Sequence, residues 1–271
     1  MTEQLAYPYI AKLGYIDETS YRCNHLPYRP IDISNKVASE WIDFFRKQEY
    51  AINELLRYLY VTAYETGVLD VRPAPEDVMN VFGMKPSDIK VVVVGQDPYP
   101  GTYRIAIGGE KVKGKDRYKY VPIANGYAFA TNSNEITSSL ETIFGAIRGV
   151  EHATGDFTLR GWINQGVFLL NRTPVLWMYN NENKDTPVKD EKLLNTPERL
   201  WGEITKNVCL FINSLSSVTF LLFGSKAASL KSHLPSSIVA SHPSGRNTSS
   251  SNPFTDEPFT LTSSTIKWRK A

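Results

Sequence analysis

Cysteine is scarce in this chain, and its scarcity excludes several kinds of site. Only two cysteines occur among 271 residues, Cys23 and Cys209, and their separation matches no metal-binding or redox spacing. A four-cysteine iron–sulfur cluster is therefore excluded. A reducing intracellular compartment, cytoplasmic or nuclear, is the simplest expectation, because disulfide-rich proteins belong to oxidising compartments.

Long hydrophobic runs and a strong net charge are missing as well. No stretch reaches about 18 apolar residues, and Met1–Gln4 does not begin a signal peptide, so we expect neither a membrane span nor secretion. The formal charge of +2 does not by itself indicate a nucleic-acid-binding protein, so any basic surface must be local. We expect one α/β domain over residues 1–271.

What the chain does have is a very apolar strand followed by a stiff polar loop. The four valines of Val91–Val94 are too apolar on both faces for an edge strand and predict the central strand of a parallel sheet. The loop Gly95–Pro100 then combines a glycine with two prolines. Its polar members, Gln96, Asp97 and Tyr99, stand where ligands bind in open α/β sheets. An ordinary tight turn capped by aspartate is the alternative.

Apolar periodicity predicts the other elements. Three further runs are expected to be strands: 166–170, 218–223 and 237–241. The expected helices are two amphipathic helices between residues 34 and 66 that break near 47–49, a short helix over 76–82, a serine-capped helix over 138–148, and a helix over 198–214 with Leu200, Ile204, Val208 and Phe211 on its apolar face. Residues 1–32 are interpreted as an N-terminal arm, and 177–197 as a polar loop.

Each predicted strand ends in polar or small residues. These are Gln96 and Asp97, Asn171, Gly224 and Ser225, and His242 and Ser244. Carboxyl ends of parallel strands lie at one edge, so these residues are expected to meet in one crevice of a three-layer α/β/α fold with a four-stranded parallel sheet. Singly, each has a structural alternative: a turn cap for Asn171, a helix cap for Ser225, a satisfied histidine for His242, and a core ring for Phe129.

The segment 101–123 is a local basic insertion. It holds six basic residues against Glu110 and Asp116, and three tyrosines are interleaved with the charges. A solvated hairpin is one interpretation. A phosphate-contacting flap beside the site is the other, because cations with interleaved aromatic rings suit splayed nucleic acid.

In this order, the motifs resemble those of the family 1 uracil-DNA glycosylases over about residues 73–268. Gly95–Tyr99 resembles the water-activating loop, Gly126–Phe129 the uracil-stacking segment, Ser139–Glu141 the end of the proline-rich loop, Gly161–Asn171 the stretch with the uracil-reading asparagine, Leu222–Ser225 the Gly-Ser loop, and Ser241–Ser244 the minor-groove loop.

The resemblance implies a role for each matching residue. Catalysis would fall to Asp97 and His242. Uracil would be bound by Gln96, Tyr99, Phe129 and Asn171. The DNA would be held by Ser139, Gly224, Ser225, Pro243, Ser244 and Arg246. The family's route to cleavage implies no metal and no cofactor.

The chain departs from the family pattern at four places. Pro100 stands where most members have histidine, and Arg246 stands where most have a wedging leucine; both are like the poxvirus branch. Residues 132–138 lack a run of prolines, which leaves the stiffness of that loop open, and 101–123 is much longer than usual. These departures suggest a divergent member of viral or phage type.

The implied partner is uracil-containing DNA, and we expect a monomer with no membrane association. A replication protein or a proteinaceous glycosylase inhibitor is a further expected partner. The main alternative function is a DNA-binding replication or processivity scaffold that keeps the glycosylase fold, as in the poxvirus member. A Ser-His-Asp hydrolase built from Ser244, His242 and Asp97 is a weaker alternative, because no Gly-x-Ser-x-Gly elbow is present.

Overall fold

The computed structural model describes residues 30–46, 48–66, 69–112, 115–179, 195–215, 217–244 and 253–271, and only the backbone within 64–69 and 104–120. Most of the expected N-terminal arm, Cys23 and Arg246 lie outside these residues. None of the described helices is both long and apolar enough to cross a membrane.

The centre of the molecule is a four-stranded parallel sheet in the order β5-β2-β7-β8. Its strands are β2 (Val91–Gly95), β5 (Val167–Asn171), β7 (Thr219–Phe223) and β8 (Ser237–Ala240). Val91 pairs with Val167 on one side and with Thr219 on the other, so β2 is an interior strand. The predicted sheet and the interior place of the valine strand are confirmed.

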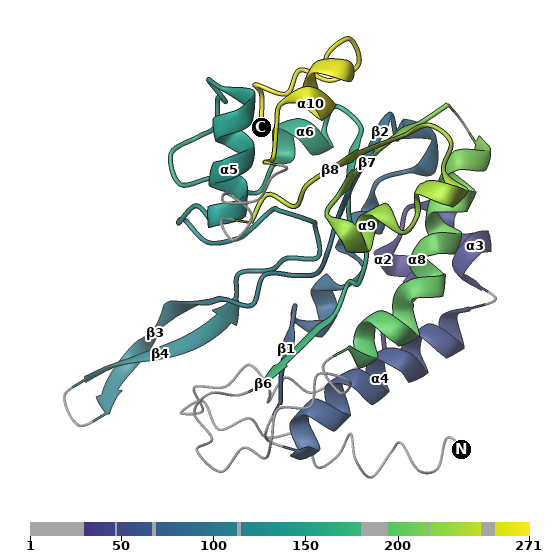
Figure 1. The fold of residues 1–271 in the computed structure, drawn as a ribbon. Coiled ribbons are helices and arrows are strands. Elements are labelled where there is room, and N and C mark those ends of the chain that lie inside the picture. The colour runs from purple at the N-terminus through teal and green to yellow at the C-terminus, as the bar shows by residue number, and fades with distance from the viewer. Residues whose placement is uncertain are drawn as a thin grey trace.

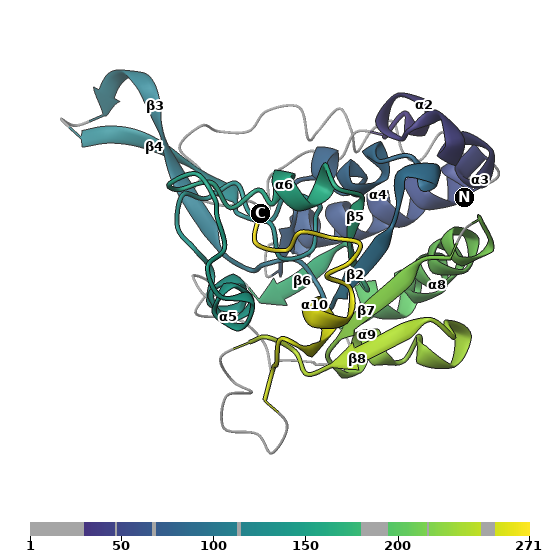
Figure 2. The same ribbon diagram turned by 90° about the horizontal axis from the view of Figure 1, so that it is seen from above.

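The two faces of the sheet are covered by separate hydrophobic clusters, which makes three layers (Figures 1 and 2). Val92 and Val94 point into the cluster beneath α4 (Glu49–Thr66) and α8 (Thr196–Leu215). Val91 and Val93 point into the cluster beneath α5, α6 and α10. All four valine side chains are at most 3% exposed. Successive side chains of a strand point to opposite faces of the sheet, so β2 is apolar on both faces. The bounds on this second face are Ser138–Ile147 for α5, Arg160–Ile163 for α6 and Glu257–Leu261 for α10.

Short helical pieces around Trp41 complete the first face beside α4 and α8. These pieces are α2 (Ile33–Lys36), η3 (Ser39–Trp41) and α3 (Ile42–Arg46), and the expected break before α4 is present. The Trp41 ring contacts five other aromatic rings, and its Nε1 donates to the Met84 carbonyl at 2.8 Å. The predicted helix over 76–82 is wrong. Two 3₁₀ turns replace it, η4 (Pro75–Asp77) and η5 (Asn80–Gly83), and a third, η6 (Pro86–Asp88), follows. The Asn80 side-chain amide donates to Asp77 Oδ1 at 2.9 Å and to the Asn125 carbonyl at 3.0 Å, so tertiary contacts hold this segment outside a regular helix.

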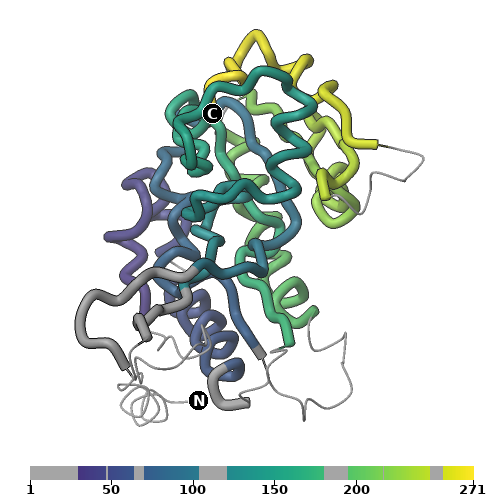
Figure 3. Tube along the Cα trace, turned by 90° about the vertical axis from the view of Figure 1, so that its left-hand side faces the viewer, coloured from purple at the N-terminus to yellow at the C-terminus, as the bar shows by residue number. Residues whose placement is uncertain are grey.

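The C-terminal residues close the second face (Figure 3). Trp162 Nε1 donates to the Trp268 carbonyl at 2.8 Å. Gly161 packs so closely on the last residue that an added Cβ would lie 2.4 Å from the Ala271 carbonyl oxygen. The end of the chain is therefore part of this layer.

Two sequence predictions on the periphery need correction. The expected loop after residue 176 begins with a strand, β6 (Leu176–Tyr179), which pairs antiparallel with β1 (Leu69–Arg72). Trp177 holds β6 against the body of the molecule, because its ring is buried and its Nε1 donates to the Leu59 carbonyl at 3.0 Å. Residues 180–194 of that loop lie outside the described part of the chain.

The apolar face of α8 is also shifted from the predicted one. Of the four predicted positions, Val208 is buried, Ile204 and Phe211 are partly buried against the core, and Leu200 is 39% exposed. The other buried positions include Trp201, Thr205, Cys209 and Ile212. The large Trp201 ring takes the core position, and this rotates the buried stripe by one residue.

The remaining features of the fold are the cap of α5, the connection from β7 to β8 and the β3–β4 hairpin. The helix α5 is capped by Thr137, whose hydroxyl oxygen accepts the Leu140 N–H at 3.4 Å, and not by a serine. The helix α9 (Ser225–Ala228) and the turn η7 (Lys231–His233) connect β7 to β8. The insertion 101–123 forms an antiparallel hairpin of β3 (Thr102–Val112) and β4 (Lys115–Pro122), which projects from the body of the molecule (Figures 1 and 2).

Candidate active site

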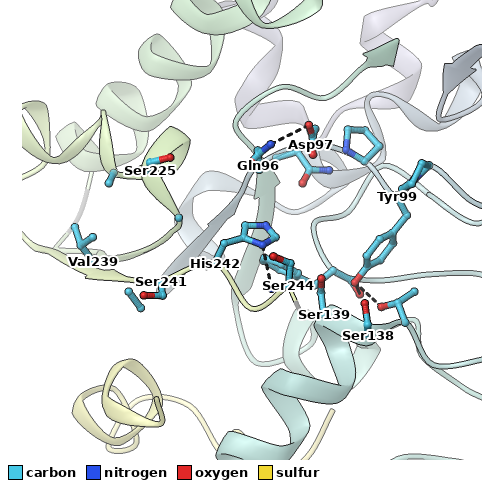
Figure 4. A pocket seen from close by; sticks show the side chains of 18 residues that line it. Gln96, Asp97, Tyr99, Ser138, Ser139, Ser225, Val239, Ser241, His242 and Ser244 are labelled. Carbon is cyan, nitrogen blue, oxygen red and sulfur yellow. Dashed lines mark hydrogen bonds between the residues drawn. The ribbon is translucent and has the colours of Figure 1, made fainter. Parts of the chain in front are cut away.

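The carboxyl ends of the four parallel strands open into one cleft of about 1020 Å³ (Figure 4). Ten of the twelve residues predicted from the sequence line it: Gln96, Asp97, Tyr99, Phe129, Ser139, Asn171, Gly224, Ser225, His242 and Ser244. Pro243 is buried and does not line the cleft, and Arg246 is outside the described residues. Residues up to 148 positions apart in the sequence, Gln96 and Ser244, thus share one surface.

Asp97 is held at the end of the central strand. The ladder of β2 and β5 continues into its loop, because the Thr173 N–H donates to the Gln96 carbonyl at 2.9 Å. The Gln96 side-chain amide donates to Asp97 Oδ2 at 3.3 Å. Burial raises the pKa of Asp97, and the Gln96 hydrogen bond opposes that rise.

An ion pair that shares a small cavity with Asp97 has two opposing effects on the pKa of Asp97. Lys226 Nζ lies 2.6 Å from Glu198 Oε2, and both residues border a smaller cavity of about 160 Å³ that Asp97 also lines. Glu198 raises the pKa of Asp97, and Lys226 lowers it. Sequence analysis missed this pair, since Lys226 and Glu198 come from α9 and α8 and no motif links them.

Asn171 and Phe129 meet over Gly95. In the parallel register Gly95 pairs with Asn171. A Cβ at Gly95 would lie 3.0 Å from Asn171 Oδ1 and 3.1 Å from Phe129 Cε2, so only glycine leaves room for both groups. Asn171 is 4% exposed and Phe129 is 7% exposed, yet both reach the cleft.

The backbone of Phe129 is fixed in an unusual conformation. Its φ is 64°, a region that favours glycine. The Tyr99 hydroxyl donates to the Phe129 carbonyl at 3.2 Å and accepts from the Thr137 hydroxyl at 2.7 Å. Burial raises the pKa of Tyr99, so the phenol stays protonated and keeps this donor. Such strain persists where surrounding contacts enforce it, often at functional sites.

His242 packs against Gly224, whose φ is 88° and where a Cβ would lie 2.9 Å from the His242 Cβ. The backbone N–H of Ser244 donates to His242 Nδ1 at 3.2 Å. In the neutral ring the proton therefore lies on Nε2. Burial lowers the pKa of His242, which favours that neutral ring. A Ser-His-Asp triad would need Nδ1 as the donor to a carboxylate, so this contact argues against the hydrolase alternative.

Hydroxyl groups line the rim of the cleft. They include three that sequence analysis did not single out, namely those of Thr137, Ser138 and Ser241. Their only sequence signal was adjacency to motif residues. The ten-residue helix α5 begins at Ser138, so its positive N-terminal end faces the cleft. Among the cleft residues that the structure describes, none is a lysine or an arginine.

The chemistry of this cleft suits a flat polar ring attached to an anionic chain. It combines an aromatic face, a carboxamide edge, a neutral imidazole, a buried carboxylate and a rim of hydroxyl groups. The buried Cys209 takes no part, since it lies in the core of α8 and burial raises the pKa of its thiol to about 12.

Comparisons with known proteins agree with this geometry. A uracil-DNA glycosylase of Borrelia turicatae is 33% identical over 192 residues, which cover 67% of this chain and 71% of that protein. A uracil-DNA glycosylase of human herpesvirus 7 is 27% identical over 232 residues, or 81% of this chain and 78% of that protein. No family model matches the chain.

Solved structures share the fold. The crystal structure of mimivirus uracil-DNA glycosylase superposes with a TM-score of 0.60 at 24% identity, covering 88% of this chain and 82% of that one. A variant of mimivirus UNG in complex with UGI superposes with a TM-score of 0.58 at 24% identity, covering 81% of this chain and 75% of that one. Given the identity and coverage of the Borrelia relative, this chain belongs to the uracil-DNA glycosylase family.

Proposed function

We propose that this protein extrudes deoxyuridine from DNA and hydrolyses its N-glycosidic bond, releasing uracil and leaving an abasic site for base excision repair. One observation carries this proposal: Asp97, Phe129, Asn171 and His242, from four separate segments, line the same cleft. The family to which the chain belongs gives the reaction, and the cleft supplies groups suited to each of its steps.

Uracil within a duplex is inaccessible, so the nucleotide must leave the stack at a cost of about a few kcal/mol. The hydroxyl groups of Ser139, Ser225 and Ser244 and nearby backbone N–H groups are suited to hold the flanking phosphates. The N-terminal end of α5 adds a favourable field for an anion. Binding of the DNA phosphates thereby offsets the free-energy cost of extruding the nucleotide.

Base recognition rests on Asn171, Phe129 and Tyr99. The Phe129 ring offers a face for stacking. The Asn171 carboxamide can accept from uracil N3–H and donate to O4, whereas cytosine presents a donor at position 4. Sites built on such hydrogen bonds discriminate by roughly 10⁴ or more. The bulk of Tyr99 would stand against C5 and exclude the thymine methyl group.

Cleavage breaks the bond from C1′ to N1, and the electron pair leaves with the uracil anion. Neutral His242 would donate from Nε2 to the charge that develops on uracil O2, as in an oxyanion hole. Ionised Asp97 would orient a water molecule on the opposite face of C1′ and stabilise the cationic sugar. The water oxygen then bonds to C1′ as its proton passes to the Asp97 carboxylate, and the released uracil anion takes up a proton from solvent.

The partners follow from the same cleft. The substrate is uracil-containing DNA, and we propose that the protein acts as a monomer folded as one domain. The UGI complex of mimivirus UNG supports a proteinaceous inhibitor as a further partner. A scaffold that uses only the fold would be free to lose Asp97, Asn171 and His242, so their joint presence supports retained catalysis over the replication-scaffold alternative.

The test is the release of free uracil. The purified protein is incubated with oligonucleotides that carry one uracil, one thymine or one cytosine at the same position. We expect free uracil and an alkali-labile abasic site from the first substrate alone. Absence of uracil release from both single-stranded and duplex substrates would leave the scaffold alternative in place.

A further inference from the structure

The β3–β4 hairpin carries a charge that the rest of the molecule lacks. Of the chain's 30 basic and 28 acidic residues, segment 101–123 holds six and two, so the remainder holds 24 and 26 and is net negative. The cleft itself has no described lysine or arginine. DNA affinity depends mainly on neutralising phosphates with such cations. Segment 101–123 therefore carries the excess of positive charge that could bind phosphates.

The root of the hairpin is fixed to the cleft on both sides. Pro100, which precedes β3, lines the cleft, and its carbonyl accepts from Nε of the buried Arg72 at 3.0 Å. At the other end, Ile123 bonds back to Gly101 at 3.1 Å and accepts from the Asn132 N–H at 3.2 Å. The hairpin thus leaves from the Asp97 loop and returns to the segment that carries Phe129.

The hairpin is long enough to follow several phosphates of a DNA strand. The eight residues of β4, along which β3 pairs with one register shift, extend to roughly 27 Å at the usual rise per residue, somewhat less than one turn of duplex. Lys115, Arg117 and Lys119 take alternate positions of the β4 backbone, opposite Val112, Ile107 and Ile105 of β3. They span roughly 13 Å, along which one DNA strand carries several phosphates.

We propose that the β3–β4 hairpin is a DNA-binding arm that holds the phosphate backbone of the duplex flanking the extruded nucleotide. The inference rests on the proposed glycosylase function, because it places the lesion in the cleft. The arm supplies affinity outside the cleft. Within the cleft, the described rim positions the substrate through hydroxyl groups and contains no lysine or arginine. Its contribution depends on substrate length: DNA that ends close to the uracil does not reach the arm.

The experiment compares two triple variants on two substrates. The arm variant carries Lys115→Gln, Arg117→Gln and Lys119→Gln. The control variant removes the same number of positive charges away from the cleft, through Arg46→Gln, Lys85→Gln and Lys90→Gln. All three residues are exposed, and Lys90 directly precedes β2, at the end of the strand opposite to the cleft. The substrates are a duplex of about 30 base pairs with a central uracil and a single strand of about six nucleotides, which is too short to reach along the arm.

We expect the arm variant to lose roughly tenfold or more in kcat/KM on the long duplex near 0.1 M salt. Its slope of log(kcat/KM) against the logarithm of the salt concentration should be shallower by about 2 to 3. Its kcat/KM on the short strand should stay within about twofold of the unmodified protein, which also verifies the fold. The control variant should match the unmodified protein on both substrates.

Equal losses in both variants would show a general charge effect and overturn the proposal, as would an arm variant that is unchanged on the long duplex. Binding to a uracil-free duplex, measured by fluorescence anisotropy, separates this question from catalysis. Weaker binding of the arm variant than of the control variant supports the arm even if no uracil is released, and equal binding contradicts it.

Discussion

The backbone N–H of Ser244 donates to Nδ1 of His242 at 3.2 Å. This contact uses the lone pair that a proton would need, so it opposes protonation of the ring in the same direction as burial does. It also fixes the tautomer, because the proton of the neutral ring must then lie on Nε2. The structure thus favours a neutral ring over an imidazolium, which suits the role that we propose for His242 as a hydrogen-bond donor to uracil O2.

The first prediction concerns the pH dependence of kcat/KM. His242 must be neutral and Asp97 ionised, so activity should fall only on the acid side. The pKa of His242 lies below its ordinary 6.5, and that of Asp97 lies above its ordinary 3.8. The acid limb of the profile should therefore have its midpoint below pH 6.5. A titration from about pH 4 to 8 tests this, and an acid limb with its midpoint above 6.5 would contradict a neutral His242.

The second prediction concerns the ion pair behind Asp97. Lys226→Gln removes a charge that lowers the pKa of Asp97 and leaves Glu198 unpaired, so the acid limb should move to higher pH. Glu198→Gln removes a charge that raises it and should move the limb to lower pH. The pH profile of each variant provides the measurement. Shifts in the same direction would show that the pair acts on folding and not on Asp97.

The third prediction concerns Gly95. Gly95→Ala places a methyl group about 3 Å from both the Asn171 carboxamide and the Phe129 ring, so both must shift. We expect a loss of about 10- to 100-fold in kcat/KM, since small displacements of positioning groups are costly. Gly83→Ala is the matched control, because its Cβ would meet nothing within 4 Å. Equal activity of the two variants would rule out close packing at Gly95 as a requirement.

The fourth prediction separates the bulk of Tyr99 from its hydroxyl. Tyr99→Phe loses the hydrogen bonds to Phe129 and Thr137, at a cost of about 1 kcal/mol of stability each, but keeps the ring. It should still reject thymine. Tyr99→Ala removes the wall and should release thymine from a thymine-containing strand. Thymine release by both variants, or by neither while uracil release continues, would contradict the role of the ring.

The sequence was most informative where chemistry and periodicity coincide. The valine strand predicted the centre of the sheet, and the polar residues after each strand predicted the cleft, because parallel strands bring their carboxyl ends together. The hairpin interpretation of 101–123 is confirmed for its backbone. Phe129 was identified from a motif, but its positive φ was not, since that conformation depends on Tyr99 and Thr137.

The failures arise where tertiary contacts decide the outcome. Burial of Trp201 rotates the apolar face of α8, and burial of Trp177 turns an expected loop into β6. Hydrogen bonds from the Asn80 side chain to Asp77 and Asn125 hold the segment of the predicted helix over 76–82 in 3₁₀ turns. The Glu198–Lys226 pair joins residues from two helices and leaves no local pattern. Pro243 is buried beside the cleft, so its DNA contact stays a prediction from resemblance alone.

The most direct test of the account is the single-turnover rate of uracil release by Asp97→Asn, measured together with its affinity for uracil-containing DNA. Asparagine keeps the size of the side chain but cannot carry the charge that orients water and stabilises the cationic sugar. We predict a rate lower by roughly 10²- to 10⁴-fold with nearly unchanged affinity. A variant that releases uracil at the unmodified rate would contradict the assignment of Asp97 and with it the proposed mechanism.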